Sequence, residues 1–279
     1  MRRIFVTGGT GYVGSALVPF LADHFPEATL MVYDSEAFGN PIADTPRTTF
    51  VKEDLRDALA LDLAIAEFRP TDVIHLAGIV TDELVAMNES KAREINEEAT
   101  ADLVSTAQAF GCQRFILMSS SAVYGTQPEV ATEETIPAPM TAYARQKLGQ
   151  ERALFAADGR MVKVVIRSAT LCGPAPRMRL DTIVNVFSKQ AWFDRHITIH
   201  GGDQWRTNLN VRDMVEFYVR LLTAPPELID GQVFNVTTGN HQAKTLATMA
   251  VRRLHAVAAT DAEVVVEDRP DPRSYRMVA

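Results

Sequence analysis

A glycine-rich segment near the start of the chain constrains the fold more than any other feature. Residues 6–14 read Val-Thr-Gly-Gly-Thr-Gly-Tyr-Val-Gly and follow directly on an apolar, strand-like run. Glycines at 8, 11 and 14 allow a buried strand to turn sharply into a helix, main-chain N–H groups to approach a phosphate, and the helix to pack tightly on the strand. The segment therefore predicts a pyrophosphate site at a helix N-terminus, with contacts from Gly8, Gly11, Tyr12, Val13 and Gly14.

The surrounding sequence separates a dinucleotide site from an ordinary glycine turn, which can have the same spacing. A helical pattern follows the segment, and a second apolar run, residues 30–33, ends in Asp34, twenty residues beyond Gly14. A carboxylate at this point accepts hydrogen bonds from both hydroxyls of a ribose and repels a 2′-phosphate. Because residues 35–44 contain no Arg or Lys that could bind such a phosphate, NAD(H) is predicted over NADP(H).

The composition is sufficient for a large hydrophobic core, and the sequence contains no run of basic residues that could bind a polyanion. The 279 residues are 47% hydrophobic and carry a net charge of −7, which argues against nucleic acid as the main partner. Cys112 and Cys172 lie far apart without metal-ligand spacing, so we expect two buried thiols in a reducing compartment and no metal site. The sequence has neither a signal-peptide core nor an apolar stretch of membrane-spanning length, so we expect a cytoplasmic protein that binds no membrane.

Alternating strand-like and helical runs predict an α/β fold with a doubly wound parallel (Rossmann) sheet. The expected strands are 4–7, 30–34, 49–51, 73–76, 115–119 and 163–167, and the expected helices lie near 14–23, 57–67, 90–110 and 142–157. After residue 168 the elements become shorter, so we expect an NAD-binding domain over 1–168 and a smaller substrate-binding lobe over 169–279. A strand near 233–237 is predicted to return to the main sheet, which would make the two lobes interleaved.

The chemistry is predicted at a serine-rich strand end and at a Tyr-x-x-x-Lys pair. Tyr143 and Lys147 share one helix face, which places the ammonium beside the phenol and favours a phenolate. A tyrosine whose pKa is lowered by the neighbouring Lys and by NAD+ itself can take a proton from an alcohol while a hydride leaves for nicotinamide. Ser120, after a buried strand, can bond the same substrate oxygen. The Tyr-Lys spacing also fits a solvated helix face, but its place after a glycine loop and a ribose-binding carboxylate favours catalysis. Tyr124 is interpreted as a packing or substrate-wall aromatic.

Together these motifs resemble the extended short-chain dehydrogenase/reductase family, in its nucleotide-sugar epimerase/dehydratase branch. The similarity covers nearly the whole chain and rests on residues 7–14, Asp34, Asp54-Leu55, His75-Leu76-Ala77, Asn96, 119–125, 143–147, 167–174 and 205–213. It implies that NAD is the cofactor, that a nucleoside diphosphate-sugar is the substrate, and that the protein is a homodimer.

The resemblance also implies roles for further cofactor contacts. Asp54 and Leu55 would hold the adenine, Leu76 and Ala77 would line the phosphates, and Lys147, with Tyr143, would contact the nicotinamide ribose. Two simpler interpretations stand beside these roles. Asp54 could cap the helix that follows it, and His75 is interpreted as a packed strand-end histidine without a role in the site.

For the substrate, the resemblance implies that fixed cations and amides hold the diphosphate. Arg206 and Arg273 match positions that grip it, since a guanidinium binds phosphate in a bidentate way, and Asn185 matches an amide that contacts it. Ser120 and Ser121 are the expected contacts to the sugar. Arg177 and Arg179 are additional candidates for the diphosphate, although arginines in a loop are usually only solvated.

Departures from the family pattern narrow the predicted reaction. Dehydratases of the family carry an Asp-Glu pair where this chain has Ser121-Ala122, and residues 167–174 lack the usual aromatic and Asn, so the sugar is left open. We therefore expect an NAD-dependent epimerase that works through a transient keto-sugar. The alternatives are a net reductase or dehydrogenase on the same scaffold and a non-catalytic dinucleotide-sensing scaffold.

The predicted homodimer is expected to form through the helices near 90–110 and 142–157. Their apolar positions exceed what one sheet-facing stripe needs, although ordinary core packing is an alternative. These positions are Ala99, Leu103, Val104, Ala107, Leu148, Leu154 and Phe155.

Overall fold

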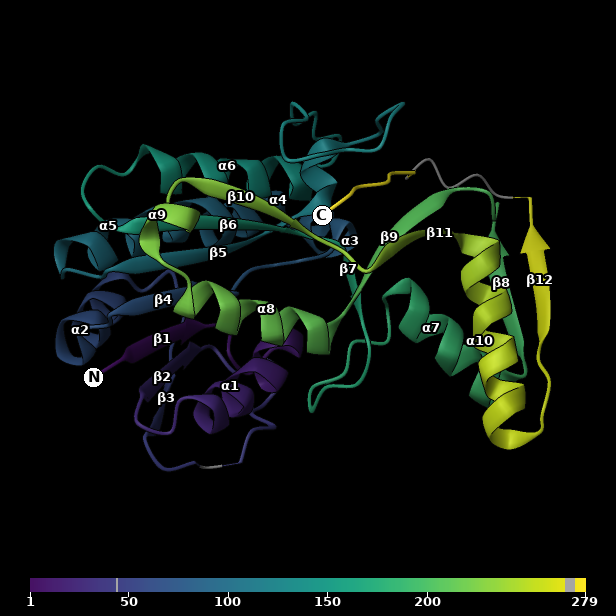
Figure 1. The fold of residues 1–279 in the computed structure, drawn as a ribbon, viewed down its shortest axis with the longest axis horizontal. Coiled ribbons are helices and arrows are strands. Elements are labelled where there is room, and N and C mark those ends of the chain that lie inside the picture. The colour runs from purple at the N-terminus through teal and green to yellow at the C-terminus, as the bar shows by residue number, and fades with distance from the viewer. Residues whose placement is uncertain (44, 269–273) are drawn as a thin grey trace.

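A seven-stranded parallel sheet forms the larger part of the protein (Figure 1), in a computed structural model that describes residues 1–43, 45–268 and 274–279. The strand order is β10-β6-β5-β4-β1-β2-β3, so the chain reverses its winding direction between β1 and β4. This order confirms the predicted doubly wound α/β fold. The strands are β1 (Arg3–Thr7), β2 (Thr29–Asp34), β3 (Thr48–Lys52), β4 (Asp72–His75), β5 (Arg114–Ser120), β6 (Val162–Ser168) and β10 (Gln232–Val236).

Side chains alternate between two cores on the two faces of this sheet, as the period of a strand requires. In β1, Ile4 and Val6 belong to one core and Phe5 to the other. The Ile4 face is covered by α1 (Tyr12–His24), α8 (Val211–Thr223) and α9 (Pro226–Ile229). The Phe5 face is covered by α2 (Ala58–Phe68), α5 (Ala99–Ala109) and α6 (Ala142–Ala156).

Local capping fixes where the helices around the site begin. Thr141 Oγ1 accepts a hydrogen bond from Ala144 N at 3.2 Å and starts α6. Asp57, and not Asp54, caps α2, because its Oδ1 accepts from Ala60 N at 3.0 Å. The capping interpretation of Asp54 is therefore wrong.

The single helix predicted near 90–110 is a succession of three segments. These are α4 (Glu89–Arg93), a π-helical turn η1 (Glu94–Glu98) and α5, while the short α3 (Asp82–Met87) precedes them. Asn96 lies buried in the π turn, where its Oδ1 accepts from Ile79 N at 2.8 Å and its Nδ2 donates to Gln146 Oε1 at 2.8 Å. The turn thus ties the loop after β4 to helix α6, in the manner of π turns at functional sites.

The smaller lobe lies beyond the carboxyl ends of the large sheet (Figure 1). It contains a three-stranded sheet of β7 (Thr170–Cys172), β9 (Trp205–Asn210) and β11 (Gly239–Gln242), and a pair of β8 (His196–His200) and β12 (Glu263–Glu267). Helix α7 (Ile183–Lys189), the turn η3 (Gln190–Asp194) and α10 (Ala243–Ala258) form its own core with β8.

The chain returns from the smaller lobe to the large sheet, as predicted. Strand β10 pairs in parallel with β6, with Val233 opposite Val165. The return includes more than this strand, because α8 packs beside α1 on the large sheet. The two lobes are therefore interleaved in sequence.

The apolar residues expected at a dimer interface are instead part of the subunit's own core. Six of the seven are at most 9% exposed and pack in the two cores of the large sheet; they are Ala99, Leu103, Val104, Ala107, Leu148 and Leu154. Only Phe155, at 36%, reaches the surface. The six buried positions therefore do not mark an interface, because α5 and α6 pack on the sheet and on each other.

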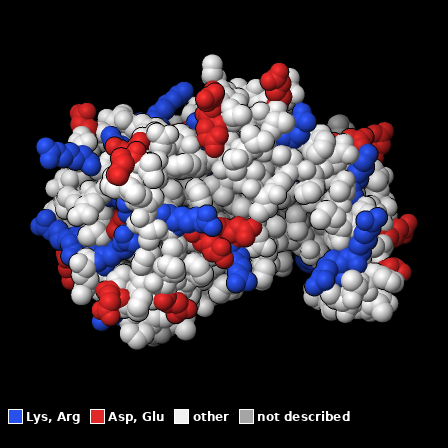
Figure 2. Space-filling model, viewed as in Figure 1, with Lys and Arg blue, Asp and Glu red and all other residues white. Residues whose placement is uncertain are grey.

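The surface gives no sign of a single dominant charge on the face shown in Figure 2, where Lys and Arg are interspersed with Asp and Glu. The outline of the molecule is notched between the larger and the smaller lobe in this view. Among the helices of the described residues, none combines the length and the apolar character needed to cross a membrane.

Candidate active site

The glycine loop between β1 and α1 forms a cradle at the carboxyl edge of the large sheet. Gly8 has a φ of +70°, and a Cβ there would lie 2.6 Å from Ala77 N. A Cβ on Gly14 would lie 2.4 Å from Gly9 Cα, so helix and loop could not pack as they do. The cradle is thus open to close main-chain approach by a phosphate group, which fits the pyrophosphate of a dinucleotide.

Asp34 lies beside this cradle at the end of β2. Its Oδ2 accepts a hydrogen bond from Thr10 N at 2.9 Å, and its Oδ1 accepts from Glu36 N at 2.8 Å. Two main-chain donors thus orient the carboxylate, and each oxygen keeps a further lone pair for a ribose hydroxyl. The residues present therefore fit NAD, and the contact of Asp34 with its ribose stays a prediction.

The remaining predicted cofactor contacts lie along the same sheet edge. Leu76 and Ala77 follow β4, and the loop they form meets the glycine loop, with Ala77 N 3.4 Å from Thr7 Oγ1. Asp54 is paired with Arg56 at 2.7 Å, and the hydrogen bond from this guanidinium lowers the pKa of the carboxyl. Leu55 is buried. The adenine contacts of Asp54 and Leu55 stay a prediction.

The three predicted catalytic residues come together at the ends of β5 and α6. Tyr143 lies in the first turn of α6, and Lys147 lies one turn further on. The Ser120 side chain, at the end of β5, is hydrogen-bonded to the Tyr143 phenol. Lys147 Nζ donates to the carbonyl of Met118 at 3.0 Å. The arrangement places a hydroxyl, a phenol and a buried amine around one point of the sheet edge.

Burial opposes the predicted phenolate while NAD+ is absent. Burial raises the pKa of Tyr143 to about 12 and lowers the pKa of Lys147 to about 8. Desolvation therefore acts against the charged form of both groups, the phenolate and the ammonium. The positive charge of the Arg179 guanidinium acts in the opposite direction and lowers the pKa of Tyr143.

His75 and Tyr124 are packing residues, as interpreted from the sequence. His75 Nδ1 lies 2.6 Å from Thr7 Oγ1 and its Nε2 2.8 Å from Thr100 Oγ1, and burial lowers its pKa to about 3. Tyr124 is 1% exposed and donates its hydroxyl proton to Asn235 Oδ1 at 2.8 Å. Neither side chain is available to a substrate.

Asn185 uses both hydrogens of its side-chain amide within the protein. Its Oδ1 accepts from Gly173 N at 3.0 Å, and its Nδ2 donates to Tyr12 Oη at 3.2 Å and to Arg179 O at 2.7 Å. Tyr12 in turn donates to Gly173 O at 2.7 Å. Asn185 thus ties the smaller lobe to the glycine loop, and its contact with a diphosphate stays a prediction.

The two loop arginines are held in place rather than freely solvated. Arg179 forms a two-point pair with Asp181, at 3.1 and 2.6 Å. The Arg177 guanidinium stacks 4.1 Å from the centre of the Phe38 ring, and the main-chain N–H of Arg177 donates to Ser15 Oγ at 3.0 Å. The loop they belong to therefore crosses from the smaller lobe to the cofactor edge.

The other predicted substrate contacts, Arg206, Ser121 and Arg273, lie in separate segments of the chain. Arg206 is 7% exposed in β9 and donates to the carbonyl of Trp205 at 2.9 Å. Ser121 is buried in the 3-10 turn η2 (Ser121–Tyr124), next to Ser120. Arg273 lies outside the described residues.

Two residues near the phenol were not singled out from the sequence. The charges of Asp82, at the start of α3, and of Tyr275, in the C-terminal segment, both act on the Tyr143 phenol and raise its pKa. Oδ1 of Asp82 is buried without a hydrogen-bond partner among the described residues. Neither residue belongs to a recognisable motif, so only the packing of α3 on α6 and the course of the last residues could reveal them.

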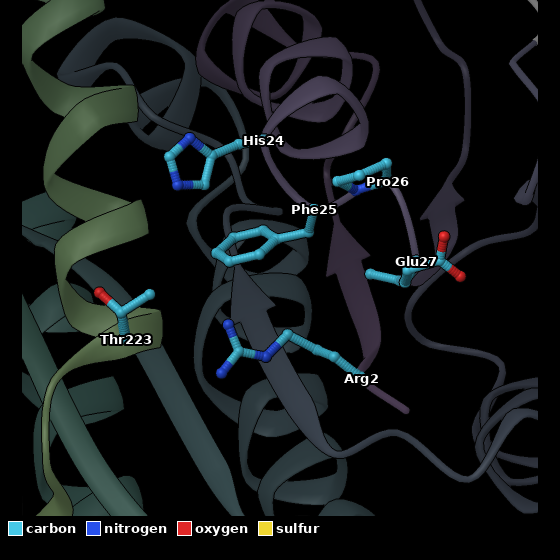
Figure 3. Close-up of a pocket in the computed structure, with 7 residues that line it drawn as sticks. Arg2, His24, Phe25, Pro26, Glu27 and Thr223 are labelled. Atoms are coloured by element: carbon cyan, nitrogen blue, oxygen red, sulfur yellow. The ribbon is translucent and has the colours of Figure 1, made fainter.

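A separate pocket of about 500 Å³ lies at the opposite, amino-terminal edge of the strands (Figure 3). It is lined by Arg2, His24, Phe25, Pro26, Glu27, Ala28 and Thr223. The Arg2 guanidinium stacks 4.8 Å from the centre of the Phe25 ring and donates to Leu222 O at 2.8 Å. Ligands of open parallel sheets bind at the carboxyl ends of the strands, so this pocket is not the reactive site.

Known proteins share the sequence pattern and the fold. The model of the NAD dependent epimerase/dehydratase family matches residues 4–237. UDP-glucose 4-epimerase of Mycolicibacterium smegmatis is 31% identical over 250 residues, which cover 85% of this chain and 77% of that protein. dTDP-glucose 4,6-dehydratase of Neisseria gonorrhoeae is 27% identical over 264 residues, or 88% of this chain and 74% of that one.

A solved structure extends the likeness to the whole fold. UDP-glucose 4-epimerase from Thermotoga maritima, crystallised with UDP-glucose, matches with a TM-score of 0.87 at 23% identity, over 99% of this chain and 89% of that chain. The family match covers most of the chain, and the glycine cradle and the oriented Asp34 fit its cofactor. The chain therefore belongs to the NAD-dependent epimerase/dehydratase family, and its cofactor is NAD.

Proposed function

We propose that this protein is an NAD-dependent nucleoside diphosphate-sugar epimerase that works through a transient keto-sugar. The observation that carries the proposal is the convergence of Ser120, Tyr143 and Lys147 at the cofactor edge of the sheet. NAD, when bound, accepts a hydride from a sugar carbon and can return it.

The side chains of the chain would supply the proton chemistry. Tyr143 Oη takes the proton of the sugar hydroxyl as the carbonyl forms, and gives it back when the carbonyl is reduced. Ser120 hydrogen-bonds the same sugar oxygen and orients it. The Lys147 ammonium stabilises the phenolate. Rotation of the keto-sugar between the two hydride transfers then inverts one carbon without a second acid or base.

The residues next to Ser120 favour epimerisation over dehydration. Elimination of water from a keto-sugar needs an acid and a base at neighbouring carbons. Ser121 and Ala122 offer no carboxylate at the positions where family dehydratases carry Asp and Glu. Asp82, whose charge acts on the phenol from α3, would supply one carboxylate but not a pair.

The diphosphate is proposed to lie under the smaller lobe. Arg206, buried in β9, and Arg179, whose charge acts on Tyr143, support a substrate with two negative charges. The relatives include proteins named for UDP-glucose and dTDP-glucose, and we propose a sugar nucleotide of this class for this chain.

The proposal is tested by following the cofactor during turnover. The protein is incubated with a panel of nucleoside diphosphate-sugars, first ranked by the thermal shift that each gives with NAD+ present. With trace NAD+, an epimer should form without net absorbance at about 340 nm. In a parallel reaction with excess NAD+, accumulation of NADH in stoichiometric amount with the oxidised sugar would instead identify a dehydrogenase, and no conversion in either reaction would favour a sensing scaffold.

We also propose that the protein is a homodimer, through the outer faces of α5 and α6. Phe155 is the exposed apolar residue on these helices that supports it. Light scattering at micromolar concentration should give twice the mass of the chain, and a monomer would reject the proposal.

A further inference from the structure

A buried carboxylate lies one helical turn beyond Lys147 on the same face of α6. Glu151 is 3% exposed. Its Oε1 accepts a hydrogen bond from Ser119 Oγ at 2.5 Å, and its Oε2 accepts from Arg167 Nη2 at 2.7 Å. Since Ser119 belongs to β5 and Arg167 to β6, two neighbouring strands fix this carboxylate.

Ser119 stands between the two residues that hold the reacting groups. On one side, the carbonyl of Met118 accepts the hydrogen bond of Lys147 Nζ at 3.0 Å. On the other side, the Ser120 side chain is hydrogen-bonded to the Tyr143 phenol. By holding Ser119, the carboxylate holds the strand end from which both contacts are made.

The charge of Glu151 acts directly on Lys147. Burial lowers the pKa of Lys147 to about 8, and the anionic Glu151 opposes this change. From β4, His75 also faces Lys147, but burial lowers the pKa of His75 to about 3 and leaves it neutral. The charged and titratable groups that act on Tyr143 come from other elements and are Arg179, Tyr275 and Asp82. Glu151 is the anion that favours the Lys147 ammonium.

The far side of Arg167 is also enclosed. Its Nη1 donates to Tyr124 Oη at 3.0 Å, and its guanidinium lies 4.9 Å from the centre of the same ring. A buried ion pair gives little net stability, because desolvation of both charges offsets their attraction. Stability alone is therefore a weak reason for a charged pair at this position.

On the basis of the reaction proposed above, we propose that Glu151 is a positioning residue for the proton that Tyr143 and Lys147 share. When the pair has lost one proton, the other can stay on the phenol oxygen or on the amine nitrogen. The anionic carboxylate favours the amine, which leaves Tyr143 as the phenolate that accepts a substrate proton. Glu151 itself touches neither the substrate hydroxyl nor the cofactor in this scheme.

The test measures the phenolate without any substrate. NAD+-saturated protein is titrated with base, and tyrosinate is followed at about 295 nm as the difference from the Tyr143→Phe variant. In Glu151→Gln, the midpoint of the Tyr143 signal should rise by about one pH unit, a tenfold change in the ionisation equilibrium. Glu97→Gln is the matched control, because Glu97 packs against Gly149 of the same helix and should leave the midpoint unchanged.

A second variant covers the case in which Glu151→Gln fails to fold with an unpaired Arg167. Glu151→Gln/Arg167→Met removes both buried charges, a replacement that buried pairs often tolerate, and a rise in the same direction is expected, smaller because the opposing charge of Arg167 is removed as well. A midpoint equal to that of the wild-type protein, in whichever variant folds, would show a purely structural ion pair and overturn the proposal. Because no sugar is present, loss of the epimerase reaction would not affect this result, and the two failures are distinguishable.

Discussion

The cofactor edge of the large sheet and the loops of the smaller lobe use their polar residues differently. At the cofactor edge, Asp34 is oriented by main-chain donors and keeps lone pairs for a ligand. In the smaller lobe, Asn185 donates both amide hydrogens within the protein, to Tyr12 and Arg179, and so has no donor left for a diphosphate. The polar groups at the strand ends are thus available to a ligand, whereas those in the smaller lobe stabilise the loops around Asn185. We therefore expect a ligand to bind Asp34 directly. In the smaller lobe, we expect Asn185 to affect a ligand only indirectly, by fixing the position of the loops with its hydrogen bonds.

The comparison is tested most strongly at the strand-end site by Tyr143→Phe. This change removes the proposed acid and base and should lower turnover by at least about a hundredfold. NAD+ affinity should stay nearly intact, because the ring and the helix remain. Steady-state kinetics and NAD+ titration measure the two quantities, and full activity in the variant would remove Tyr143 from the mechanism.

A smaller effect is expected at the ribose position. Asp34→Ala removes charge-assisted hydrogen bonds to the ribose and the charge that repels a 2′-phosphate, so NAD+ should bind about tenfold more weakly or worse. Discrimination against NADP+ should also relax. Calorimetric titration with both cofactors checks this, with Asp23→Ala at the exposed end of α1 as control. Unchanged selectivity would refute the ribose assignment.

A substitution at Asn185 in the smaller lobe should weaken substrate binding indirectly, by destabilising the loops that Asn185 holds. Asn185→Ala cuts the tie between the loop and Tyr12, so the variant should lose about 1–3 kcal/mol of unfolding free energy. KM should rise a few-fold, with kcat less affected. Chemical denaturation and kinetics measure these effects against Ser188→Ala, on the exposed side of α7. A large loss of substrate affinity at unchanged stability would mean that Asn185 binds the diphosphate directly.

The smallest effect is expected in the core below the site. The Tyr218 hydroxyl is buried in α8 without a hydrogen-bond partner among the described residues. Tyr218→Phe should therefore leave turnover unchanged and should not lower the melting temperature, since no hydrogen bond is lost. A drop in activity would reveal a connection between α8 and the site that the geometry does not suggest.

The sequence predicts more residues of the cofactor edge than of the smaller lobe, because the two regions differ in the range of the contacts that form them. The glycine cradle, Asp34 and the Tyr143–Lys147 pair are short-range patterns, because each needs only a strand end or one helical turn to place its atoms. The ties of Asn185 and the charge of Asp82 near the phenol depend on loops from distant parts of the chain, which no local pattern encodes.

Burial explains two further differences from the predictions. Burial opposes the phenolate expected from the spacing of Tyr143 and Lys147, and the spacing does not reveal how deeply both groups are buried. The apolar positions of α5 and α6 predicted a dimer surface, yet most of them fill the two cores. Amphipathic helices that pack both on a sheet and on a neighbouring helix have wide apolar faces without any partner subunit.

The central claim, a keto-sugar that is reduced again without loss of water, is tested most directly by mass spectrometry of the product formed in D2O. In the epimerase reaction the migrating hydrogen stays on the cofactor and returns to carbon, while the other carbon-bound hydrogens are untouched. After transfer back to H2O, the product should have the mass of the substrate and contain no carbon-bound deuterium. A product lighter by one water, with deuterium bound to carbon, would contradict the account and identify a dehydratase.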